Sequence, residues 1–118
     1  MSILEEIEGS RVEALISAQV LSEVSGILYR QYGMKDTTKH VAGMLSYRLR
    51  VHPVTAEMVR AAAEYSRDFG ILPYDGIHVA TAVNFGAAEI ISADRELDKA
   101  KKVILRKDLL DYSKSKKP

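Results

Sequence analysis

Two neighbouring segments carry most of the information about how this chain folds: residues 72–83, LPYDGIHVATAV, and residues 88–94, AEIISAD. Pro73 cannot extend a preceding helix, and Asp75 followed by a run of small and apolar residues predicts an acidic N-cap at the start of a buried helix. The second segment is too short for a helix and contains two isoleucines, which predicts a buried strand. Ligand sites in open α/β sheets lie at the carboxyl ends of strands, and we expect Asp94 at such an end.

The composition limits the class of protein. A length of 118 residues suits one domain with one core. Charged residues make up 28% of the chain and the net charge is +1, so composition favours no class of partner. The absence of cysteine excludes disulfides and thiolate metal sites, and no apolar run reaches the roughly 18 residues that could span a bilayer. Because the first residues are acidic, we expect no targeting segment and a cytoplasmic protein with no membrane contact.

Periodicity and turn residues predict alternating helices and strands. The expected helices are 2–8, 18–32, about 38–49, 56–69 and the helix that begins at Asp75; the expected strands are 11–17, 50–54, 88–92 and 101–106, with single turns at 95–99 and 109–112. Expected helix caps are Ser17, either Thr37 or Thr38, and Thr55. Strands separated by helical segments imply a parallel sheet with helices on both faces. We expect one domain over residues 1–112 and a flexible, lysine-rich tail over 113–118.

Three motifs then point to a family. Glu23 lies in VLSEV, residues 75–82 read DGIHVATA, and residues 92–98 read SADRELD. In this order they resemble the PIN domain family, the metal-dependent ribonuclease fold best known from VapC-type toxins of toxin–antitoxin pairs. That family has an acidic residue on the helix after its second strand, a D-A-I-H-V-A-T-A helix and a T-A-D-x-x-[FL]-D element. The resemblance covers nearly the whole chain and implies a three-layer α/β/α fold with a short, mainly parallel sheet.

The chain departs from the family at its start. PIN domains begin with a central strand that ends in an aspartate and is followed by a helix, and this sequence starts after both. The domain is therefore expected to be incomplete at its N-terminal side, with the gap between strands 12–16 and 88–92. Three explanations stay open: the chain is a fragment or late start of a longer protein, a partner chain donates a strand, or the fold closes up without it.

The resemblance implies a carboxylate site. Its metal ligands would be Glu23, Asp75 and Asp94, with Asp98 assisting directly or through water. Hard cations such as Mg²⁺ and Mn²⁺ prefer oxygen ligands, and the bound metal would activate water and neutralise charge on the phosphate of an RNA substrate. Three converging acids also repel one another, so at least one should hold its proton more tightly than in a peptide.

Each of these residues also has a simpler interpretation. Asp75 can be a helix cap, Asp94 can cap the turn that begins at Arg95, and Glu23 can be a residue bordering an apolar stripe. Asp98 can belong to a solvated turn. His78 lies one helical turn after Asp75 and is interpreted as a packed histidine rather than a general base.

Two functions therefore remain. The first is a Mg²⁺- or Mn²⁺-dependent endoribonuclease, with the toxin of a toxin–antitoxin pair as its specific form and an antitoxin as its partner. The second is a non-catalytic interaction or RNA-binding module with a degenerate acidic site. A sheet without its central strand leaves apolar surface or unpaired backbone to cover, so we expect a homodimer in either case.

Overall fold

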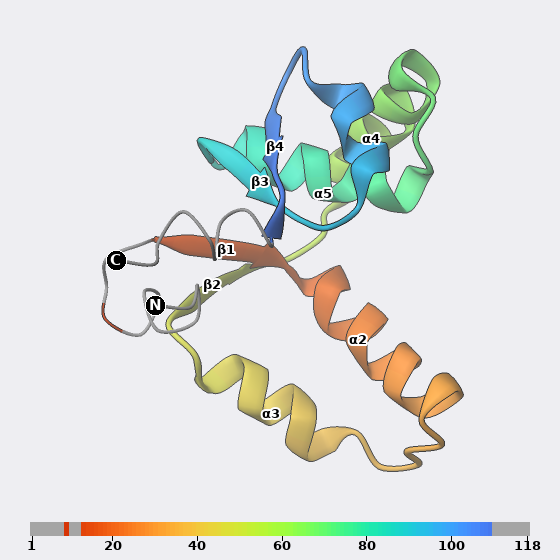
Figure 1. Ribbon diagram of the computed structural model, residues 1–118, viewed down its shortest axis with the longest axis vertical. Coiled ribbons are helices and arrows are strands. Elements are labelled where there is room, and N and C mark those ends of the chain that lie inside the picture. The colour runs from red at the N-terminus through yellow and green to blue at the C-terminus, as the bar shows by residue number, and fades with distance from the viewer. Residues whose placement is uncertain (1–8, 10–12, 110–118) are drawn as a thin grey trace.

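The computed structural model describes residues 9 and 13–109, in which helices and strands alternate (Figure 1). In chain order the elements are β1 (Ala14–Ser17), α2 (Ala18–Gln31), α3 (Thr38–Ser46), β2 (Leu49–His52), α4 (Ala56–Phe69), α5 (Pro73–Asn84), β3 (Glu89–Ile91), the 3₁₀ helix η1 (Arg95–Ala100) and β4 (Leu105–Lys107). The predicted mixture of helices with short parallel strands is confirmed. The helix expected over 2–8, residues 110–112 of the last turn and the tail over 113–118 lie outside the described residues.

The strands form two separate parallel pairs. β1 pairs with β2, with Ala14 opposite Leu49, and β3 pairs with β4, with Glu89 opposite Leu105. Among the described residues no backbone pairing joins β1 to β3. The expected single sheet is therefore divided between β1 and β3, where the sequence had led us to expect a gap. Within the described part of the chain, the sheet has not closed over that gap.

Helix α5 connects the two pairs of strands, because it contacts both β1 and β3 and also packs along α4. Figure 1 shows β1 and β2 between the α4–α5 pair and the α2–α3 pair, which gives the layers of an α/β fold. Val79 of α5 is fully buried. It belongs to a core that also contains Ile71, Ala82, Leu97, Ala100 and Ile104. Because α5 is buried on most of its surface, its small side chains are what allow neighbours to pack close to it.

The start of α5 differs from the prediction. The helix begins at Pro73 with Leu72 as the N-cap residue, and Asp75 lies in the first turn without capping it. Proline favours the first helical position, because the N–H that it lacks would have no partner inside the helix. Ser17 does occupy the N-cap position of α2, as predicted, but its side chain makes no capping hydrogen bond.

Other boundaries were predicted with small errors. Thr55 caps α4 as expected, since its Oγ1 accepts a hydrogen bond of 3.2 Å from the Met58 N–H. Thr37, one of the two expected caps, occupies the N-cap position of α3 without a side-chain capping bond, and Asp36 Oδ1 accepts from the Thr38 N–H at 3.0 Å instead. The last strand is shorter than expected, since residues 101–103 continue the turn after η1. No helix in the described ranges is long and apolar enough to cross a membrane.

Candidate functional site

Two of the predicted acidic residues, Glu23 and Asp94, lie near enough to Asp75 for their charges to act on its carboxyl group. Asp75 lies in the first turn of α5, Asp94 follows β3, and Glu23 lies on α2. Partial burial raises the pKa of the Asp75 carboxyl above its ordinary value, and the negative charges of Asp94, Glu23 and Glu96 raise it further. His78 acts in the opposite direction. Burial is thus the first cause of the raised pKa of Asp75, and acids on α2 and at the start of η1 add to it.

Glu23 is oriented by two neighbours. Gln19, one turn earlier on α2, donates a hydrogen bond of 2.8 Å from Nε2 to Glu23 Oε1. The Nε2 atom of His78 lies 3.4 Å from the same oxygen. His78 is thus a half-buried helix histidine, and it links α5 to the acid on α2. The spacing of four residues between Gln19 and Glu23 was a signal in the sequence for the first contact. The contact with His78 depends on the tertiary fold.

Asp94 has a structural role in addition to its proposed one. Its Oδ1 accepts a hydrogen bond of 3.0 Å from the Glu96 N–H and so caps η1. Its own N–H donates to Ser92 Oγ at 3.0 Å. Capping of the turn that begins at Arg95 is therefore confirmed. It engages one carboxylate oxygen, which leaves Asp94 Oδ2 without a hydrogen bond to the described residues.

Asp98 is held by an arginine that sequence reasoning did not single out. Arg106 of β4 donates from Nε to Asp98 Oδ1 at 2.8 Å and from Nη2 to Asp98 Oδ2 at 3.2 Å. The same guanidinium donates to the Ser92 carbonyl and to Asp108 Oδ2. The hydrogen bond from Arg106 lowers the pKa of Asp98. Asp98 thus ties η1 to β4, and its role as a metal ligand stays a prediction.

The carboxylates are the type of ligand that a hard divalent cation prefers, but they do not by themselves form a complete ligand set. Carboxylate oxygens are the donors that Mg²⁺ and Mn²⁺ prefer. In the part of the chain that the structure describes, however, no group of three or more histidine, aspartate or glutamate side chains lies close enough to hold a metal ion. The charges of Asp94 and Glu23 act on Asp75, but these described side chains do not meet at one point.

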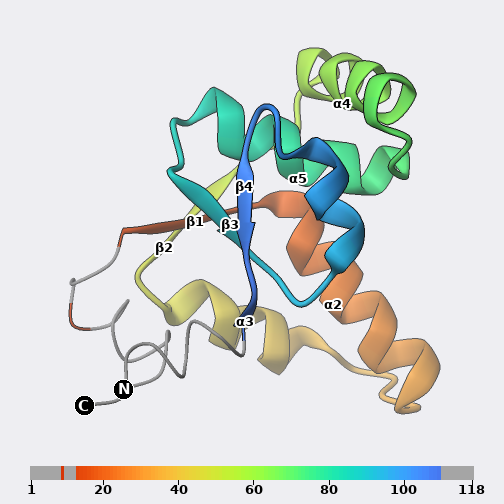
Figure 2. The same ribbon diagram turned by 45° about the horizontal axis from the view of Figure 1, so that its top comes forward.

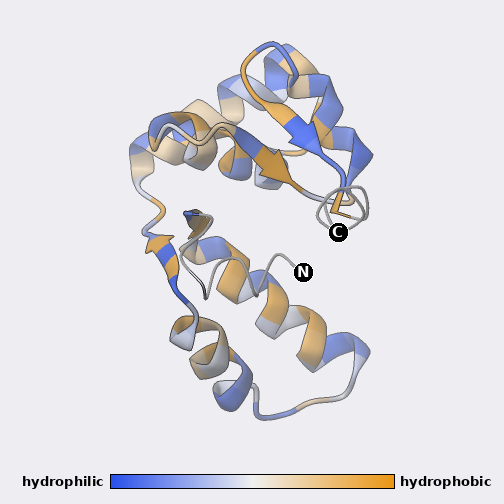
Figure 3. Ribbon diagram, turned by 60° about the vertical axis from the view of Figure 1, so that its left-hand side comes forward, coloured by the Kyte–Doolittle hydropathy of each residue, from blue (hydrophilic) through white to orange (hydrophobic). Residues whose placement is uncertain are grey.

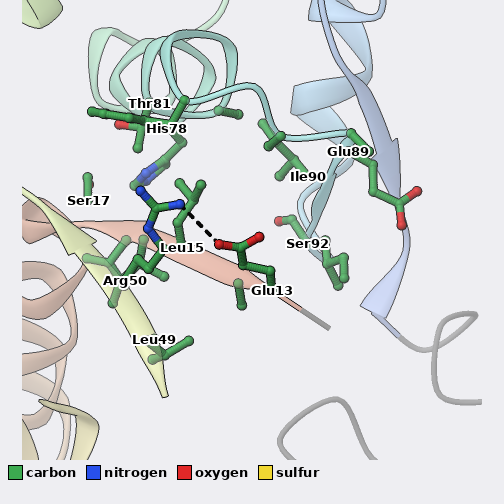
Figure 4. Close-up of a pocket in the computed structure, with 18 of the residues that line it drawn as sticks. Glu13, Leu15, Ser17, Leu49, Arg50, His78, Thr81, Glu89, Ile90 and Ser92 are labelled. Atoms are coloured by element: carbon green, nitrogen blue, oxygen red, sulfur yellow. Dashed lines mark hydrogen bonds and ion pairs between the residues drawn. The ribbon is translucent and has the colours of Figure 1, made fainter. Parts of the chain in front are cut away.

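A groove of about 830 Å³ lies beside Glu23, and Asp75 and Asp94 are not among the residues that line it. β1 forms one wall, β3 forms the other, and α5 lines it between them (Figure 4). His78 and Glu23 also line the groove, and the ion pair between Glu13 and Arg50, at 3.1 Å, lies near the start of β1. Ser17 at the end of β1 is only 2% exposed, and its Oγ has no hydrogen-bond partner among the described residues. Because Ser17 was interpreted as a helix cap, the sequence did not lead us to expect that its hydroxyl group would lack a partner.

The raised pKa of Asp75 predicts a pH-dependent effect of replacing it. Protonated Asp75 favours the folded chain, so its stabilising contribution is fully present below its ordinary pKa and is lost as the pH rises through the raised value. Asp75→Asn stays neutral at every pH. We expect it to raise the thermal unfolding midpoint in EDTA at about pH 7 and to change it little at about pH 3. A lower midpoint for Asp75→Asn at the higher pH would contradict this account.

The comparison with known proteins adds the family. The family model for the PIN domain matches residues 1–103 of this chain. No curated protein and no solved structure gives a significant match to it. The matched range contains β1, α5 and β3 as well as all four predicted acidic residues, and the two-sided packing of helices on short parallel strands agrees with it. This chain belongs to the PIN domain family.

Proposed function

We propose that this protein is a divalent-metal-dependent endoribonuclease that hydrolyses phosphodiester bonds of RNA. PIN domains are in general nucleases of the ribonuclease type, and they typically depend on divalent metal ions. The observation that carries the proposal is the raised pKa of Asp75, which burial raises first and the charges of Asp94 and Glu23 raise further. A carboxyl group whose pKa is raised by burial and by neighbouring acids is a candidate for a functional site.

The proposed ligands of the metal are Glu23, Asp75 and Asp94, and Asp98 joins through water because Arg106 already engages both of its carboxylate oxygens. When bound, Mg²⁺ or Mn²⁺ would activate water and neutralise charge on the scissile phosphate. The chain's own residues prepare the acids for this role. Gln19 and His78 fix Glu23, and the capping bond to Glu96 fixes Asp94 while leaving one of its oxygens available.

A second hollow beside Glu23 supports RNA as the substrate. It has a volume of about 730 Å³, and its lining includes Tyr29, Arg30 and Tyr74. The two tyrosines are 49% and 67% exposed. Nucleic-acid bases stack on exposed aromatic rings, and an arginine can contact the phosphates between them. The hollow therefore suits the strand on one side of the scissile bond.

The finer assignment is a cytoplasmic toxin that acts as a homodimer and is paired with an antitoxin protein. Exposed apolar side chains at Ile27 of α2, at Tyr32 just after α2 and at Leu45 of α3 support a second protein surface there. Sedimentation at micromolar concentration tests the dimer. A monodisperse monomer would contradict it.

A non-catalytic interaction or RNA-binding module is the alternative. The observation that favours it is that no three acidic or histidine side chains of the described segments approach closely enough to hold an ion. In this alternative the acids are remnants, and their residual repulsion explains the raised pKa of Asp75 equally well. A measurement of metal binding distinguishes between these two functions.

The deciding experiment is calorimetric titration of Mn²⁺ into the protein and into two variants. Under the proposal the protein binds Mn²⁺ saturably, and Asp94→Asn weakens binding by about tenfold or more. The matched control is Asp68→Asn, which removes the same charge from an exposed residue paired with Arg67 and should leave the affinity unchanged. Absence of saturable binding, or equal binding in both variants, would favour the non-catalytic module.

A further inference from the structure

The segment that carries Asp94 is attached to β4 at both of its ends. This Asp94 segment, residues 92–98, links the end of β3 to η1, and in Figure 2 the chain then returns along β4 beside β3. Nη1 of Arg106 donates a hydrogen bond of 2.8 Å to the Ser92 carbonyl. Nε and Nη2 of the same side chain donate to the two carboxylate oxygens of Asp98. One guanidinium therefore contacts the first and the last residue of the Asp94 segment.

Asp94 is fixed inside this segment by its immediate neighbours. The Ser92 N–H donates to the Lys107 carbonyl at 3.1 Å, so the backbone of Ser92 is bonded to β4 through its nitrogen as well as its oxygen. Ser92 Oγ in turn accepts from the Asp94 N–H, and Asp94 Oδ1 accepts from the Glu96 N–H. The orientation of the Asp94 carboxylate thus depends on how Ser92 and Glu96 are held. Arg106 holds the segment to which both belong.

A simpler interpretation is that Arg106 is only a charged residue of the kind that marks edge strands. Charged side chains are common there, and Figure 3 shows β4 as hydrophilic beside the hydrophobic end of β3. Exposed ion pairs of such residues contribute little to stability. The Arg106 side chain, however, is only 10% exposed, and it also donates to Asp108 Oδ2 at 3.1 Å. A guanidinium with little exposure and with partners on several sides is held in one position, so it can hold the segment in place.

The arrangement requires arginine in particular. The guanidinium group is a planar fork of donors with fixed geometry, which allows Nε and Nη2 to meet both oxygens of Asp98 while Nη1 reaches the Ser92 carbonyl. Lysine carries the same charge on a single ammonium group, which cannot meet both residues in this geometry. Replacing Arg106 by lysine therefore keeps the charge and removes the connection between the two ends of the segment.

We propose that Arg106 is a positioning residue of the acidic site: it holds the Asp94 segment on β4 and so fixes the Asp94 carboxylate for a divalent cation. The part of this inference that concerns the cation rests on the proposed function, in which Asp94 is a metal ligand. Groups that orient a metal ligand through hydrogen bonds change metal affinity by roughly 10- to 100-fold when they are removed. The attachment of the segment itself involves no metal and can be measured without one.

The first test is amide hydrogen exchange in EDTA on the unchanged protein and on two variants. Arg106→Lys is the test variant, and Arg60→Lys is the matched control, because Arg60 also pairs with two acids but is exposed on α4. Rates at Asp94 and Glu96 are compared with the rate at Val79, whose exchange reports opening of the core. We expect Arg106→Lys to speed exchange at Asp94 and Glu96 about tenfold relative to Val79, and Arg60→Lys to leave it unchanged.

The second test is calorimetric titration of Mn²⁺ into the same three proteins. Arg106→Lys should weaken binding about tenfold or more, and Arg60→Lys should bind as the unchanged protein does. A purely structural role of Arg106 would lower the thermal unfolding midpoint but leave the Mn²⁺ affinity of the folded protein unchanged. If Arg106→Lys does not fold, Asp98→Asn takes its place in the exchange measurement, because an amide side chain has only one oxygen that can accept from Arg106. It should speed exchange at Asp94 in the same way.

The outcomes separate this proposal from the proposed function. Exchange at Asp94 and Glu96 that is equal in Arg106→Lys and Arg60→Lys would overturn the proposal. Faster exchange in Arg106→Lys with unchanged Mn²⁺ affinity would also overturn it, because Arg106 would then anchor the segment without positioning a metal ligand. Failure of the unchanged protein to bind Mn²⁺ contradicts the proposed function instead, and the exchange rates in EDTA still decide whether Arg106 fixes Asp94.

Discussion

Asp75→Asn is expected to lower metal-dependent cleavage of single-stranded RNA by at least about a hundredfold. Asparagine has the shape of aspartate but lacks the charge that a divalent cation needs at this position. Asp75 is also the acid on which the charges of Asp94 and Glu23 act together, so its loss affects the centre of the proposed cluster. The measurement is the initial rate of cleavage of a fluorescent RNA in Mn²⁺ and in EDTA.

The chain offers a matched control for this prediction. Asp68→Asn makes the same chemical change at an exposed residue and should cleave at the rate of the unchanged protein. Loss of folding cannot explain the expected loss of activity, because the metal-free Asp75→Asn protein should be more stable at neutral pH, as argued from its raised pKa. Cleavage that persists unchanged in Asp75→Asn would remove Asp75 from the site.

Gly76→Ala is expected to destabilise the fold by about 1–3 kcal/mol, although alanine is the better helix former. A Cβ atom at Gly76 would collide with the Ala62 carbonyl oxygen and lie 3.0 Å from the Ala62 carbonyl carbon and Cα. These are backbone atoms of α4, so relief requires that α4 and α5 move apart.

The measurement is equilibrium unfolding in urea, and α3 supplies the control. Gly43 lies inside α3, and a Cβ built there meets nothing within 4 Å. Gly43→Ala should therefore stabilise the protein by about 0.5–1 kcal/mol, through helix propensity alone. If Gly76→Ala were as stable as Gly43→Ala, the close approach of α5 to α4 would be wrong.

Local chemistry in the sequence was enough to predict the order and type of the elements from β1 to β4. Thr55 and Asp94 cap the helices that follow them, and Gly70 ends α4 with a φ of 68°. Such signals act within one turn of the chain, so they can be recognised without the rest of the molecule. The error at the start of α5 was also local. Pro73 was taken only as the end of a preceding helix, and the preference of proline for the first helical position was overlooked.

The sequence by itself determined that this is a PIN-like α/β chain with acids at Glu23, Asp75 and Asp94. Only the tertiary structure decided that a groove lies between β1 and β3, and that the Ser17 Oγ at the end of β1 has no hydrogen-bond partner among the described residues. It also decided that Arg106 donates a hydrogen bond to Asp98. The contact between His78 and Glu23 belongs to the same group. The groove and the contact between His78 and Glu23 each join residues that lie far apart in the chain. Their distance is set by how α5 packs against both pairs of strands, and no local pattern encodes that packing.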